Sequence, residues 1–194
     1  MKKLILSIFT LIVIFGLSGC SIKHELKQDK AYTQSKSKEM YTNKISIENI
    51  SIEKMNYSLE KRPNGFMGSA NILIIDNNFN ERNLKAVLEQ YFKNVSVDNE
   101  VKNDIKIISK LKDFKWEPIF GGQLNEFFIE IEVFYKNKSI LKKEYHEIYS
   151  KRNFIASYKL NLNDLMEVVV SQNLFELYES KFIPDLKEAL SKSI

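Results

Sequence analysis

Residues 127–149, FFIEIEVFYKNKSILKKEYHEIY, contain the pattern that decides the fold. Apolar and aromatic side chains occupy every second position from Phe127 to Tyr135, with acidic residues among the positions between them. This two-residue period predicts a strand with one face in a core. Asn137 and Lys138 predict a two-residue hairpin turn, because Asn tolerates a positive φ. The returning strand is carried by Leu141, Tyr145 and Tyr149.

The segments before this hairpin predict further strands around one helix. Residues 45–52 alternate but slip in phase, which predicts either one bulged strand or two short strands. Residues 70–75 are a continuous apolar strand candidate, and a short strand is expected at 95–97. From residue 80 to 92 the apolar side chains recur at helical spacing, and Asn80 at the start is a suitable N-cap.

A longer strand is expected between these elements and the hairpin, from Ile105 through Trp116. The apolar positions change parity within it, so a bulge near Lys112 and Asp113 is needed to join the two halves.

The C-terminal segment keeps helical spacing, and Asn173 is the one polar interruption of its apolar stripe. Pro184 either kinks this helix or begins a second one. The order of elements predicts an α+β fold: a mixed or antiparallel sheet of about four to six strands, with an amphipathic helix and a long C-terminal helix packed on it.

The first twenty residues, MKKLILSIFTLIVIFGLSGC, indicate a secretory signal. Two lysines precede a 14-residue, largely apolar run that is too short to span a bilayer comfortably. The ending Leu17, Ser18, Gly19 and Cys20 resembles the bacterial lipobox. In that motif the cysteine thiol receives a diacylglycerol, the leader is cut before the cysteine, and the new amine is acylated, for example with palmitate. The alternatives are an ordinary secretory leader or an uncleaved membrane anchor.

These observations divide the chain into three parts: residues 1–19 as a cleaved signal peptide, 20–43 as a lipidated Cys20 with a flexible tether, and 44–194 as a single periplasmic α+β domain. The tether has five lysines, three acids and scattered apolar residues, which is typical of a solvated segment. Its 23 residues would let the domain move about 25–30 Å from the membrane.

Charge excludes one class of partner. The whole chain has a net charge of +4, but residues 44–194 hold 22 basic and 22 acidic side chains. A neutral domain lacks the one-sided basic field that nucleic-acid binding needs. Local pairs such as Lys142 with Lys143, or Lys151 with Arg152, remain candidates for contact with an acidic lipid.

The chain resembles the YajG-like family of outer-membrane lipoproteins. The resemblance rests on the lipobox and on patterns within residues 80–194, among them the helix at 84–90, the stretch 104–111 and the opening of the last helix at 161–164. It implies an outer-membrane lipoprotein with no established catalytic residues and no well-defined activity. Weaker resemblances are to the lipopolysaccharide-assembly lipoprotein family LptE and to auxiliary lipoproteins of ABC-type lipid transporters. LptE proteins usually continue with Gly and an aromatic residue after the lipidated cysteine, whereas Ser21 and Ile22 follow here.

No residue pattern specifies an enzyme, a metal site or a cofactor. Glu130 and Glu132 share one face of a strand, but a solvated face explains them better than acid–base chemistry. Glu144 and His146 share a face too, and a cross-strand hydrogen bond is the expected role of His146, because no nucleophile motif accompanies it.

Exposed aromatic residues are the better candidates for function. Phe128 and Phe134 lie on the polar face of the best strand, where they could contact a partner unless the C-terminal helix covers that face. Trp116 and Phe120, in the turn region 116–122 that precedes this strand, are the second candidates.

The sequence thus predicts a non-enzymatic lipoprotein, anchored in the outer membrane and facing the periplasm, that presents an interaction domain to an envelope protein or lipid. The alternative is an accessory lipoprotein of lipopolysaccharide or phospholipid transport. An envelope hydrolase is a third and weaker reading.

Overall fold

The computed structural model describes residues 22–26, 50–54, 58–61, 71–97, 104–119, 122–152 and 162–193. The strands are β1 (Ile22–Leu26), β2 (Ile50–Ile52), β3 (Ser58–Lys61), β4 (Asn71–Asp76), β5 (Val95–Val97), β6 (Ile105–Ile119), β7 (Gly122–Tyr135) and β8 (Lys138–Arg152). The helices are α2 (Asn77–Leu88), α3 (Leu162–Leu177), the π-helix η2 (Tyr178–Phe182) and α4 (Ile183–Ser193).

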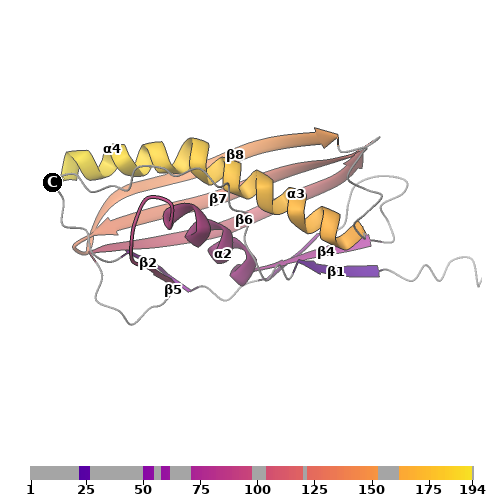
Figure 1. Ribbon diagram of the computed structural model, residues 1–194, viewed down its shortest axis with the longest axis horizontal. Coiled ribbons are helices and arrows are strands. Elements are labelled where there is room, and N and C mark those ends of the chain that lie inside the picture. Colours follow the sequence, from indigo (N-terminus) through magenta and orange to yellow (C-terminus); the bar gives the residue numbers. More distant parts are fainter. Residues whose placement is uncertain are drawn as a thin grey trace, which may run out of the picture.

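The strands form a five-stranded sheet in the order β5-β2-β6-β7-β8 and a three-stranded sheet in the order β1-β4-β3. Strand β2 is parallel to β5 and β6, whereas β6, β7 and β8 are antiparallel, so the large sheet is mixed. Its three long strands give the molecule its long axis, and the helices lie along one face of the sheet (Figure 1). The α+β prediction is confirmed.

The alternation read in the central strand separates the two faces of the sheet. Every second residue of β7 from Asn125 to Val133 is buried, and the bulge expected in β6 occurs between Leu111 and Asp113. The turn between β7 and β8 is one residue earlier than expected. Lys136 and Asn137 have φ values of 48° and 65°, so they form the two-residue turn in place of Asn137 and Lys138.

The first helix begins at Asn77 and not with Asn80 as its N-cap, so that prediction is wrong. Asn80 is fully buried, and its side-chain amide donates to Ser109 Oγ at 3.3 Å. The Tyr178 hydroxyl donates to the Asn80 amide oxygen and lies 3.3 Å from Ser109 Oγ. The amide therefore joins α2, β6 and η2 inside the core, a role that outweighs capping because buried polar groups need partners.

The C-terminal helix is continuous in direction but changes its winding. Helix α3 passes into the π-helix η2, and Pro184 follows as the second residue of α4. Tyr178 and Phe182 of η2 are fully buried. Asn173, the polar interruption of the stripe, is buried too, and its amide has no hydrogen-bond partner among the residues that the structure describes.

Residues 22–26 correct the prediction of a flexible tether over 20–43. They form β1, which pairs with β4 in parallel register from Ile22 opposite Asn71 to Leu26 opposite Ile75. Leu26 is 2% exposed and belongs to the core. The segment orders because burying Leu26 and completing a strand ladder outweigh its polar composition.

Several predictions lie outside the described residues: the signal peptide with Cys20, the rest of the tether at 27–43, and the strand expected at 45–49. Among the residues that the structure does describe, no helix is long and apolar enough to cross a membrane.

Candidate functional site

The side of the large sheet that faces away from the helices is the candidate functional site. We call it the outer face. Helices α2, α3 and α4 all lie on the opposite side of the sheet (Figure 1), and no helix of the described ranges covers the outer face. Its central side chains alternate with the buried ones and come from three strands: Lys112 and Lys115 on β6, Glu126, Phe128, Glu130, Glu132 and Phe134 on β7, and Lys142, Glu144, His146 and Ile148 on β8.

Phe128 is the centre of a four-residue group that we call the Phe128 cluster, with Lys115, Glu126 and His146. The His146 ring stacks on the Phe128 ring, with centroids 4.2 Å apart and planes tilted by 14°. Lys115 Nζ lies 5.1 Å from the Phe128 centroid, a cation–π contact. The cluster fixes the rotamer of a partly exposed aromatic ring, which lowers the entropy cost of using it in binding.

Glu126 joins Lys115 and His146 within the cluster. It accepts a hydrogen bond from Lys115 Nζ at 2.9 Å, and its other oxygen lies 2.7 Å from His146 Nε2. The hydrogen bond from Lys115, followed by the one from His146, holds the pKa of Glu126 below its ordinary value. Glu126 thus remains a carboxylate that orders both neighbours.

We expect Glu126→Gln to reduce stability only where the carboxylate is charged. Because the folded-state pKa of Glu126 is lowered, its stabilisation is complete above the unfolded-state pKa and disappears as the pH falls through the folded-state value. The variant should lose about 0.5 kcal/mol near pH 7, as exposed ion pairs contribute little, and less at an acidic pH at which the folded-state carboxylate has gained its proton. Urea unfolding at the two pH values measures this, and an equal loss at both would contradict the assignment.

Further along the outer face the charges are paired across strands. Lys112 Nζ lies 3.0 Å from Glu130, and Lys142 Nζ lies 3.1 Å from Glu132. The hydrogen bonds to Glu132 from Lys142, and then from Ser139, lower the pKa of that carboxyl. The sequence interpretation of Glu130 and Glu132 as members of a solvated face is confirmed.

Ile148 adds an exposed apolar side chain beside the cluster. It stands opposite Glu126 in the β7–β8 register and is 57% exposed, the highest value among the large hydrophobic residues that the structure describes. The outer face therefore combines an ordered aromatic ring, an exposed aliphatic side chain and a surrounding set of paired charges.

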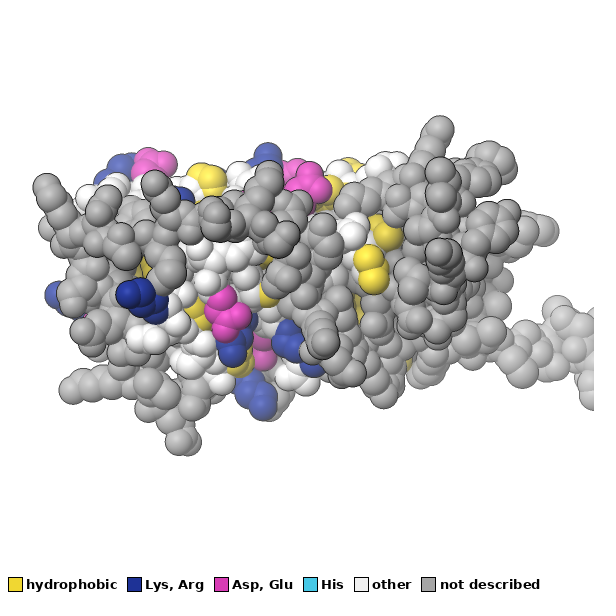
Figure 2. All heavy atoms as spheres, in the orientation of Figure 1, with side chains coloured by type: hydrophobic (Ala, Val, Ile, Leu, Met, Phe, Trp, Pro, Cys, Tyr) yellow, Lys and Arg dark blue, Asp and Glu magenta, His cyan; other side chains and the backbone are white. Residues whose placement is uncertain are grey.

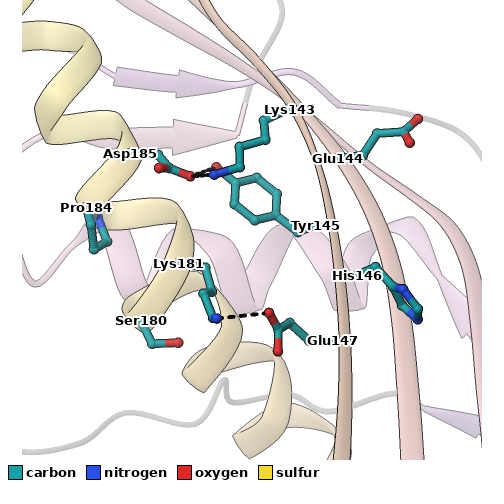
Figure 3. Close-up of a pocket in the computed structure, with 9 residues that line it drawn as sticks. All are labelled: Lys143, Glu144, Tyr145, His146, Glu147, Ser180, Lys181, Pro184 and Asp185. Carbon is teal, nitrogen blue, oxygen red and sulfur yellow. Dashed lines mark hydrogen bonds and ion pairs between the residues drawn. The ribbon is translucent and has the colours of Figure 1, made fainter.

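A cleft of about 480 Å³ lies on the other side of β8, between this strand and the η2–α4 segment (Figure 3). Lys143 and Tyr145 point from β8 toward Asp185, whose carboxylate accepts from Lys143 Nζ at 2.8 Å and from the Tyr145 hydroxyl at 2.7 Å. Lys181 reaches Glu147 at 3.1 Å. These contacts join α4 and η2 to the sheet, so the cleft is first of all a structural junction.

Burial and hydrogen bonding together determine the protonation states of Tyr145 and Asp185 at this junction. Burial, and then the hydrogen bond to Asp185, raises the pKa of Tyr145 far above its ordinary value, so the hydroxyl stays a donor. Burial opposes ionisation of Asp185, but the hydrogen bonds from Lys143 and Tyr145 outweigh it and lower the pKa of Asp185. The junction has a neutral phenol and a charged carboxylate.

Tyr145→Phe tests this junction. We expect a loss of about 1–2 kcal/mol of unfolding free energy near neutral pH, because the hydroxyl donates to a charged, partly buried acceptor. The loss should shrink in acid, as the pH falls through the lowered pKa of Asp185 and its carboxylate gains a proton. Denaturant titrations of the two proteins provide the values. A loss that does not change with pH would show that Asp185 is not the acceptor.

Of the predicted contact residues, two lie together on the outer face and one lies in the core. Phe128 and Phe134 both belong to the outer face and are partly exposed, so the possibility that the C-terminal helix covers them is excluded. Trp116 is only 6% exposed and lies in the core, so its prediction as a contact residue is wrong. Phe120 lies outside the described residues.

The basic pair Lys142 and Lys143 does not form a patch. Lys142 pairs with Glu132 on the outer face, whereas Lys143 pairs with Asp185 on the helix side. Figure 2 views the helix side, where described basic side chains lie close to described acidic ones and the described hydrophobic side chains are scattered. Lys142 and Lys143 therefore do not act together as one basic patch.

Comparison with known proteins identifies a structural neighbour and no family. No family model matches the chain, and no curated protein matches it. Among solved structures, a crystal structure of protein XCC0632 from Xanthomonas campestris, described with the family model DUF330, is similar with a TM-score of 0.49 and 6% sequence identity, covering 88% of this chain and 99% of that one.

Proposed function

We propose that this protein is a lipid-anchored, non-enzymatic component of a bacterial outer membrane, and that its periplasmic domain binds a protein partner through the outer face. The observation that carries the proposal is the ordered Phe128 ring beside the exposed Ile148, on a sheet face that no described helix covers. Ordered aromatic anchors surrounded by polar groups are typical of protein-binding surfaces.

The charge distribution favours a protein over an acidic lipid as the partner. On the outer face Lys112, Lys115 and Lys142 each pair with a glutamate. A lipopolysaccharide or anionic phospholipid would need unpaired positive charge, or a groove for acyl chains. Paired charges around an apolar centre instead suit a partner with complementary polar groups at its rim.

The anchor part of the proposal is supported by the sequence. Leu17, Ser18, Gly19 and Cys20 end a leader of the right length, and Ser21 is not the Asp that favours inner-membrane retention in many Gram-negative species. Two or three acyl chains on Cys20 would hold the protein on the membrane nearly permanently, since each buried methylene contributes about 0.8 kcal/mol.

Site-specific photo-crosslinking in intact cells tests the binding face. A photoreactive amino acid in place of Ile148 should give one discrete higher-mass product, because this side chain is 57% exposed on the proposed surface. The matched control is the same amino acid at Glu188, an exposed position on α4 at the helix side. The product should disappear when Phe128→Ala is added.

Two outcomes would contradict the proposal. Equal products from positions 148 and 188 would mean that the outer face is not selective. The second outcome is a crosslinked product at position 148 that persists when Phe128→Ala is added, while no neighbouring outer-face position gives a product. This result would show that the partner does not contact the Phe128 cluster.

A further inference from the structure

We propose that the end of the domain at which β1 begins lies against the lipid surface that holds the anchor, so that the domain stands end-on on its membrane. This inference rests on the proposed attachment of lipid to Cys20. The partner of this end of the domain is the headgroup surface of the membrane that holds the anchor.

The length of chain between anchor and fold carries the argument. Cys20 precedes Ile22, the first residue of β1, by only two positions. Two residues span at most about 7 Å when fully extended. A lipid on Cys20 would therefore hold the start of β1 within a few ångströms of the headgroups, whereas the expected 23-residue tether would have let the domain move freely.

Strand β1 is paired into the sheet of the domain and is not a flexible tether. All five of its residues are in register with β4, from Ile22 opposite Asn71 to Leu26 opposite Ile75. Leu26 is 2% exposed, so pulling β1 away would expose a core side chain as well as break the ladder. An anchor attached just before β1 would therefore restrain the position of the whole domain.

Figure 1 shows which elements lie at the same end of the domain as the start of β1. The start of β1, the end of β8 and the start of α3 lie at one end of the long axis. The turn between β7 and β8 and the C-terminal end of α4 lie at the other end. Because β8 has 15 residues, the two ends are separated by about 50 Å.

This orientation places the Phe128 cluster at a defined height. Phe128 is six residues after the first residue of β7, Gly122, which belongs to the membrane end. Six strand residues span about 20 Å. The outer face would therefore stand roughly perpendicular to the bilayer, with its aromatic centre close enough for a partner held in the same membrane.

Energy transfer to labelled lipids tests the orientation. The sequence has one cysteine, so a second one introduced into the lipidated protein is the only free thiol. Ser150→Cys and Lys138→Cys place a donor dye at two exposed positions of β8, 12 residues and about 40 Å apart. The lipidated protein is incorporated into vesicles of phosphatidylethanolamine and phosphatidylglycerol that contain an acceptor-labelled lipid, and N-terminal mass analysis verifies the acyl groups on Cys20.

We expect transfer from position 150 to exceed that from position 138 severalfold. A control protein with 20 Gly and Ser residues inserted between Ser21 and Ile22, a spacer with a reach of about 25 Å, should lose most of this difference. Equal transfer from both positions in the lipidated protein without the insertion, or stronger transfer from position 138, would overturn the end-on orientation and leave the lipid anchor intact. An unmodified Cys20 would overturn both the anchor and this inference.

Discussion

Replacing Phe127 by alanine should lower the unfolding free energy by about 3–5 kcal/mol, whereas the same change at its neighbour Phe128 should cost less than about 1 kcal/mol. Phe127 is fully buried, with its ring centroid 5.0 Å from that of Phe114 and 6.1 Å from that of Tyr149. Its removal leaves a cavity in the core between sheet and helices. Phe128 lies on the outer face and is partly exposed, so its removal uncovers one face of the already exposed His146 ring and opens no cavity.

Urea titrations of the two variants in a common Cys20→Ala background measure this difference. The pair is its own control, because the residue type, the strand and the size of the deletion are the same. Comparable losses from both variants would show that both sides of β7 are covered. The outer face could then not be a binding surface, and the proposed function would fail with it.

Changing Cys20 itself to alanine should abolish attachment to the membrane. Lipobox processing needs the thiol, so the variant should accumulate as an unlipidated precursor or a mislocalised chain and should incorporate no labelled palmitate. The effect is large because the transfer of several acyl chains into the bilayer is lost at once. Metabolic labelling and fractionation of cell envelopes give the result.

The matched control for this prediction is Ser21→Ala, which leaves the four lipobox residues unchanged and should still be labelled and membrane-bound. Normal lipid labelling of the Cys20→Ala variant would refute the anchor. It would favour an ordinary secretory leader or an uncleaved membrane helix.

The central hairpin can be predicted because the residues that determine it are close together in the sequence. The two-residue alternation from Phe127 to Tyr135 fixes which side of β7 is buried, and the change of parity near Lys112 marks the bulge that the structure has between Leu111 and Asp113. The same reasoning extends to Ile148. It has the parity of His146, so its place on the outer face could have been found from the returning strand.

Trp116 shows how a bulge changes an assignment. After the bulge, Phe114 and Trp116 have the parity of the core, and both are buried. The bulge that the sequence predicts already implies this core-facing parity for Trp116, and closeness to a turn does not change it. An aromatic residue close to a turn is exposed only if its strand parity agrees.

The failures concern contacts that are distant in sequence. Strand β1 is polar over Lys23, His24 and Glu25, and its partner β4 is 49 positions away, so composition alone indicated a tether. Asn80 looked like an N-cap because short polar residues are common there. Its actual partner Tyr178 is 98 residues away, and no local pattern contains that hydrogen bond.

Affinity capture from native envelopes tests the central claim most directly. The lipidated protein, its Phe128→Ala/Ile148→Ser variant and a Glu188→Ala control are purified in parallel, and the bound proteins and lipids are quantified by mass spectrometry. We predict one protein in stoichiometric amount with the wild type and the control, reduced severalfold with the outer-face variant. Enrichment of lipopolysaccharide or phospholipid without such a protein, or equal capture by all three, would contradict the account.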